Sequence, residues 1–98
     1  MWFDREGRPI GVRRYVQLAR DPAYRRVGLT DVGDVRVSTV WLGLDHRFGP
    51  GPVPLIFETM VFGGDLDGYQ ERYGSAVAAL AGHDQWVARV RASRKARH

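Results

Sequence analysis

The chain contains no cysteine, and this absence removes several kinds of chemistry at once. Without cysteine there is no disulfide bond, no thiolate metal ligand and no thiol nucleophile. No stretch approaches the roughly 18 consecutive apolar residues that a transmembrane helix needs. The first seven residues, MWFDREG, carry charges where a signal peptide has an apolar core. We therefore expect a cytoplasmic protein without membrane partners.

Lysine is also scarce, because fourteen of the fifteen basic residues are arginine. The net charge of +4 is unevenly distributed along the chain. Residues 1–88 hold ten basic and eleven acidic residues, whereas residues 89–98 hold five basic residues and no acidic one. The net positive charge therefore belongs to the C-terminal segment.

The 98 residues are enough for one folded unit with a modest core. Residues 2–10 predict a short strand or a hairpin, with a turn at Glu6 and Gly7. Apolar residues at helical spacing predict a helix over residues 12–19, which Asp21 and Pro22 end. The composition predicts strands over residues 24–31, with Val27 and Leu29 on one face, and over residues 35–45, 53–62 and 69–73.

Ser75 is the expected N-cap of a helix that runs to about Ala92. We expect a buried stripe on this helix, made of Ala76, Ala79, Leu80, His83, Val87 and Val90. The domain then covers residues 1–93, and the basic tail 94–98 frays into solvent. The fold class is α+β: an antiparallel sheet of four or five strands, a C-terminal helix packed on one face and a short N-terminal helix.

The strands at 35–45 and 53–62 form the central hairpin. Partners in an antiparallel pair have residue numbers with a constant sum, and a loop centred near residues 48–49 makes that sum about 97. Ser38 then lies opposite Thr59, and Thr39 opposite Glu58. With His83 of the C-terminal helix, which can bond to Glu58 or Thr39, these side chains form a predicted polar girdle: Ser38, Thr39, Glu58, Thr59 and His83.

Both faces of this hairpin carry apolar residues, so either a bulge at Ser38 and Thr39 swaps the faces or both faces are covered. Surplus apolar strand surface indicates contact with a partner. We expect this surface to bind another protein or a second copy of the chain. The residues expected to form it are Trp41, His46, Phe48 and Phe62.

The stretch VSTVWLGLDHRFGPGPVPLIFETMVFGG, Val37 to Gly64, and the later ALAGH, Ala79 to His83, resemble a family of small proteins encoded by bacteriophages and prophages. The resemblance covers roughly the whole chain and is strongest in the hairpin. It implies a phage or prophage accessory protein in the cytoplasm of a host cell, with a host or phage protein, or a second copy of the chain, as its partner. No catalytic residue and no cofactor follow from it.

Two other functions remain open on the residues. The C-terminal basic residues can contact the phosphates of a nucleic acid in a salt-dependent way; they are Arg89, Arg91, Arg94, Lys95 and Arg97. A small metal-dependent enzyme would use Asp45, His46, Glu58 or His83, which are suitable ligands for a divalent ion. Neighbouring strand residues such as Asp45 and His46 point to opposite faces, however. The sequence therefore favours a non-enzymatic role.

Overall fold

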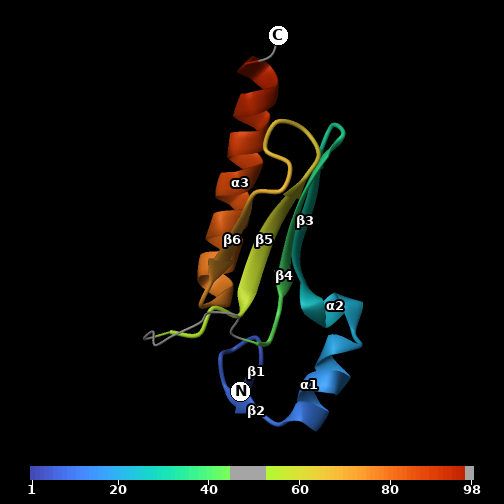
Figure 1. Ribbon diagram of the computed structural model, residues 1–98, viewed down its shortest axis with the longest axis vertical. Helices are drawn as coiled ribbons and strands as arrows, with labels where there is room; N and C mark the ends of the chain where they lie inside the picture. The colour runs from blue at the N-terminus through green and yellow to red at the C-terminus, as the bar shows by residue number, and fades with distance from the viewer. Residues whose placement is uncertain (45–52, 97–98) are drawn as a thin grey trace.

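The computed structural model describes residues 1–44 and 53–96. Figure 1 shows a long sheet with one helix along it and the N-terminal elements at one end. The sheet has four antiparallel strands in the order β3-β4-β5-β6, which confirms the predicted α+β class. In chain order the elements are β1 (Trp2–Phe3), β2 (Pro9–Ile10), α1 (Val12–Ala19), α2 (Pro22–Arg25), β3 (Arg26–Val32), β4 (Val35–Trp41), β5 (Phe57–Phe62), β6 (Gln70–Tyr73) and α3 (Ala76–Ala96).

The predicted N-terminal elements form where local signals place them. β1 and β2 pair as a hairpin, and α1 has the expected bounds. Asp21 and Pro22 end α1 and also begin α2, because the Asp21 carboxylate accepts a hydrogen bond of 3.0 Å from the backbone N–H of Ala23. The hairpin attaches to the sheet beyond the end of β4, where the N–H of Phe3 donates to the carbonyl of Gly43 at 2.8 Å.

The central hairpin has a register one residue away from the predicted one. Thr39 lies opposite Thr59, Ser38 opposite Met60, and Val40 opposite Glu58. A shift of one residue moves every side chain of a strand to the other face relative to its partner. The predicted pairs Ser38–Thr59 and Thr39–Glu58 are therefore wrong.

Burial alternates along β4 and β5 without interruption, so no bulge lies at Ser38 and Thr39. The odd-numbered residues of both strands are buried beneath α3, and the even-numbered ones face the other way. The irregularity lies in β3 instead, between Arg26 and Gly28. This bulge places Val27 against the core, whereas Leu29 is exposed on the opposite side. The prediction of Val27 and Leu29 on one face is wrong for that reason.

Helix α3 begins as predicted, because the backbone N–H of Ala78 donates to the Ser75 hydroxyl at 3.1 Å. It continues to Ala96 rather than ending near residue 92, so the expected fraying is wrong for residues 94–96. Leu80 is half exposed, and the predicted stripe missed Gly82 and Trp86. The buried face of α3 consists of Ala79, Gly82, His83, Trp86, Val87 and Val90. No helix within the two described ranges is long and apolar enough to cross a bilayer.

Gly82 allows α3 to approach β6 closely, because the Tyr73 ring occupies the space that a Cβ atom at position 82 would need. We predict that Gly82→Ala destabilises the protein by about 1–3 kcal/mol through overpacking. Inside a helix, Gly→Ala usually raises the free energy of unfolding by about 1 kcal/mol, so the expected effect has the opposite sign. Urea unfolding followed by circular dichroism measures it.

The matched control for Gly82→Ala is Ala88→Gly, in the interior of α3 and on its exposed side. It reports the intrinsic helix propensity and is expected to cost about 1 kcal/mol. A stabilised Gly82→Ala variant would show that Tyr73 moves aside without cost, and would contradict the prediction.

Candidate functional site

The face of the sheet opposite α3 is the candidate site, and we call it the open face. Figure 1 shows α3 along one side of the sheet, while α1 and α2 lie near one end of β3 and β4. Phe62 is 48% exposed on this face and Leu29 is 41% exposed. No described helix or strand covers them. The apolar side chains of the open face are Leu29, Val40, Leu42, Met60 and Phe62.

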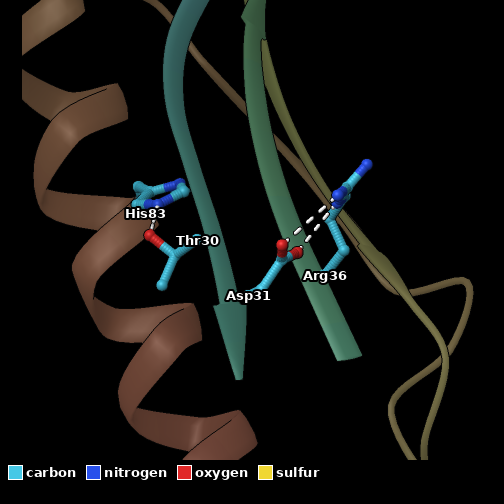
Figure 2. Close-up of polar contacts among 4 residues, drawn as sticks. All are labelled: Thr30, Asp31, Arg36 and His83. Atoms are coloured by element: carbon cyan, nitrogen blue, oxygen red, sulfur yellow. Dashed lines mark hydrogen bonds and ion pairs between the residues drawn. The ribbon is translucent and has the colours of Figure 1, made fainter. Parts of the chain in front are cut away.

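Two ion pairs flank this apolar row. The Arg36 guanidinium donates to the Asp31 carboxylate at 2.8 and 3.3 Å, and Arg72 donates to Glu58 at 3.0 Å. Figure 2 shows Asp31 and Arg36 on the side of β3 and β4 away from α3, while Thr30 points toward the helix. The hydrogen bond from Arg36 lowers the pKa of Asp31 below its ordinary value. Asp31 and Glu58, the two described carboxylates in these pairs, are therefore already engaged with arginines of the same chain.

The open face continues into a hollow of about 520 Å³ between the sheet and the two short helices. We call this hollow the basic groove, because three arginines line it together with apolar side chains. The residues used below are Arg25, Arg26, Arg36, Leu29, Val40 and Phe62. Charge and apolar surface thus meet at one end of the open face.

A buried polar cluster lies on the other side of the sheet, beneath α3. His83 is 6% exposed, and its Nδ1 lies 2.7 Å from the Thr39 hydroxyl. Its Nε2 lies 2.9 Å from the Thr30 hydroxyl, as Figure 2 shows. Thr39 also hydrogen-bonds Thr59 across the hairpin. We call Thr30, Thr39, Thr59 and His83 the threonine–histidine cluster.

The cluster has the properties of a structural contact. Burial lowers the pKa of His83, and the nearby charge of Asp84 opposes this only in part. Threonine hydroxyls occupy both ring nitrogens, which leaves neither of them for a substrate or a metal ion. The imidazole therefore fixes α3 to β3 and β4 in its neutral form.

The structure divides the predicted polar girdle between the two faces of the sheet. Thr39, Thr59 and His83 come together under α3, and the predicted bond from His83 to Thr39 is present. The alternative bond from His83 to Glu58 is not formed, because Glu58 lies on the open face beside Arg72. Ser38 also lies on the open face, opposite Met60. Neighbouring residues of a strand point to opposite faces, so Ser38 separates from Thr39 and Glu58 from Thr59. The register found in the structure then places Thr59, rather than Glu58, beside Thr39.

The predicted interaction residues are also separated. Trp41 is only 2% exposed, and its indole N–H donates to the carbonyl of Phe3 at 3.0 Å, so its expected exposure is wrong. Phe62 lies exposed on the open face as expected. His46 and Phe48 lie outside the described residues. Of these four predicted residues, Phe62 is the one that the structure places on the open face.

The residues of the metal hypothesis are not brought together where the structure describes them. Glu58 and His83 lie on opposite faces of the sheet, and Asp45 and His46 lie outside the described residues. Within residues 1–44 and 53–96, no three histidine or carboxylate side chains gather in a way that could hold a metal ion. The described part of the chain gives this hypothesis no ligand set.

The basic residues of α3 have different surroundings. Arg89 stacks over the Trp86 ring at 4.7 Å, and Arg94 forms an ion pair with Asp34. Arg91 and Lys95 are exposed. Arg97 lies outside the described residues. Two of the four described cations are thus engaged in contacts within the chain, which reduces the charge available to a nucleic acid.

Sequence reasoning missed Thr30, Arg25 and Arg26. A buried histidine on a helix needs a polar partner for each ring nitrogen, and this requirement could have directed attention to Thr30. The two adjacent arginines after a short helix were a visible signal, but their position beside the open face depends on the sheet. Comparisons of the chain with models of protein families, with curated proteins and with solved structures find no match.

Proposed function

We propose that the chain is a small accessory protein of the phage type that acts by binding another protein through the open face. The observation that carries the proposal is the apolar row on a sheet face that α3 leaves uncovered. Leu29 and Phe62 each keep nearly half of their surface in solvent there. Burying an apolar side chain contributes about 1.5–3 kcal/mol when it is complete. Covering these two residues and their neighbours therefore favours association.

The phage-type part of the proposal rests on the resemblance of residues 37–64 described above. An enzymatic role has less support from the described residues. Glu58 and Asp31 are paired with arginines, and His83 is enclosed with both ring nitrogens bonded. A general acid or base must reach its substrate by a hydrogen bond or through one water molecule. These three groups are engaged within the fold instead.

Capture from a lysate of cells that express the chain, after nuclease treatment, tests the proposal. Three tagged proteins are compared: the wild type, Phe62→Asp on the open face, and Val77→Asp on the outer side of α3. Val77 is 79% exposed, so its variant carries the same charge change on an unrelated surface. We expect a defined protein that the wild type and Val77→Asp retain and that Phe62→Asp loses.

Other outcomes contradict the proposal. If Phe62→Asp retains the same proteins as the wild type, the open face is not the contact. If the wild type captures no protein after nuclease treatment, but captures nucleic acid from an untreated lysate, the function is assigned to the basic residues of α3 instead. Deletion of residues 89–98 would then remove the binding and its salt dependence.

A further inference from the structure

Arg25 and Arg26 lie at the point where the open face meets the basic groove. Arg25 is the last residue of α2, and Arg26 begins β3 opposite Val40. Both are exposed, and neither forms an ion pair with any residue in the described ranges. The neighbouring carboxylate of Asp21 caps α2. Within the part of the chain that the structure describes, two positive charges thus lie beside an uncovered apolar row without a paired carboxylate.

The other charges of the open face indicate which partner can satisfy these arginines. Asp31 is paired with Arg36, and Glu58 with Arg72. From the described part of its open face, a second copy packed here would bring carboxylates that are already engaged, together with two more uncompensated arginines. Like charges at an interface oppose association. A different partner that carries its own carboxylates next to apolar side chains is complementary to the surface.

We propose that the open face and the basic groove bind an acidic amphipathic helix of another protein. Its apolar side chains cover Leu29, Met60 and Phe62, and its carboxylates pair with Arg25 and Arg26. This inference rests on the proposed function and names the chemistry of the partner. Arginine suits the contact with the partner's carboxylates, because a guanidinium binds a carboxylate through two parallel hydrogen bonds.

The dimensions of the sheet suit a helix. The cross-strand row of Arg36 and Phe62 lies four residues from the row of Arg26 and Val40, or about 13 Å along the strands. A helix rises about 5.4 Å per turn, so it spans this distance in two to three turns. Side chains at positions i, i+3, i+4 and i+7 then face the sheet. α3 already packs against the opposite face of the same sheet in this way.

A single-stranded nucleic acid is also anionic, but the groove does not suit its bases. Recognition of single strands uses accessible aromatic rings on which the bases stack. Tyr15, which lines the groove, is stacked on Trp2 with ring centroids 3.9 Å apart. Trp41, which also lines the groove, is buried. Among the described residues this leaves Phe62 as the accessible ring of the groove, and one ring cannot stack successive bases. The remaining apolar side chains of the open face are not aromatic, which favours a peptide.

Selection from a random library of displayed 16-residue peptides, with the full chain as bait, tests the inference. We expect recovered peptides to combine apolar residues at helical spacing with aspartate or glutamate on one flank. Fluorescence anisotropy then measures a recovered peptide against variants of the chain. We expect Arg25→Glu/Arg26→Glu to weaken binding at least about tenfold, since charge reversal replaces two attractions by repulsions. Arg13→Glu/Arg14→Glu on α1 carries the same charge change outside the groove and is expected to bind like the wild type.

The remaining outcomes separate the inference from the proposed function. The recovered peptides could instead be neutral, fail to bind Phe62→Asp and still bind Arg25→Glu/Arg26→Glu. That result would overturn the acidic partner and leave the open face as the binding surface. If the recovered peptides bind Phe62→Asp as tightly as the wild type, or if no peptide is enriched, both the inference and the proposed function are overturned. A twenty-nucleotide oligothymidine could bind the wild type more tightly than the best peptide does and fail to bind Arg25→Glu/Arg26→Glu. That result would assign the groove to nucleic acid instead.

Discussion

Trp41→Asp is expected to unfold the protein. Trp41 is 2% exposed and packs with Leu18 and Phe57, and its ring meets Tyr24 edge-on at a centroid distance of 5.0 Å. Removing a buried tryptophan side chain costs about 3–5 kcal/mol. Placing a carboxylate among apolar side chains adds several kcal/mol. The total stability of a small domain is about 5–15 kcal/mol, so we expect loss of the folded circular dichroism spectrum and of the cooperative urea transition.

Phe62→Asp is the matched comparison, because it introduces the same residue in place of another aromatic side chain of the central hairpin. Phe62 is 48% exposed and lies in the same cross-strand row as Arg36. We expect this variant to remain folded, with a free energy of unfolding within about 1 kcal/mol of the wild type, as for most surface substitutions. A folded Trp41→Asp variant, or an unfolded Phe62→Asp variant, would contradict the assignment of the two faces.

The elements that the sequence predicted well depend on local signals. Helical spacing gave α1 its bounds, and Ser75 marked the start of α3 as an N-cap. Asp21 and Pro22 likewise marked the break after α1. Each signal acts through backbone hydrogen bonds within a few residues. Such elements can be predicted without knowing what packs against them.

The register of β4 and β5 could not be predicted in this way. It was inferred from the centre of a long loop and from the match between polar residues. The structure instead places two threonines opposite each other, where both are buried and hydrogen-bonded. The difference of one residue decides which side chain of β5 lies beside each side chain of β4. It places Thr59 rather than Glu58 beside Thr39 under α3, and Glu58 lies on the open face. The burial of Trp41 comes instead from its packing against Leu18 and Tyr24.

The bulge in β3 was also beyond the sequence pattern. Gly28 lies beneath the His83 ring, and a Cβ atom there would come within 2.9 Å of Nδ1. The close approach depends on α3, which is distant in sequence. It turns Thr30 toward His83 and leaves Leu29 on the open face. The position of Leu29 on the open face therefore follows from a contact that only the folded chain reveals.

His83→Leu is expected to destabilise the protein by about 2–4 kcal/mol at pH 7.5. The substitution removes the hydrogen bonds at 2.7 and 2.9 Å and leaves the hydroxyls of Thr39 and Thr30 without that partner beneath α3. Each buried polar group left without a partner costs about 1–3 kcal/mol. Thr30→Val is the milder comparison, because it removes one hydroxyl and keeps the shape of the side chain. Urea unfolding measures both.

The same residue gives the stability a pH dependence of known sign. Burial lowers the pKa of His83 in the folded protein, whereas an unfolded chain has a histidine pKa of about 6.5. The unfolded state therefore binds more protons as the pH falls below about 6.5, and the free energy of unfolding decreases by at most about 1.4 kcal/mol per pH unit. The contribution is fully present above that pH and is lost as the pH falls toward the folded pKa.

Urea unfolding between pH 8 and pH 5 measures this dependence above the range in which most carboxylates titrate. We expect the difference in unfolding free energy between the wild type and His83→Leu to be constant above about pH 7 and to shrink at lower pH. Taking the difference removes the contribution of the other histidines, which both proteins share. A difference that does not change with pH would mean that His83 titrates equally in both states, and that the threonine–histidine cluster does not hold it in the neutral form.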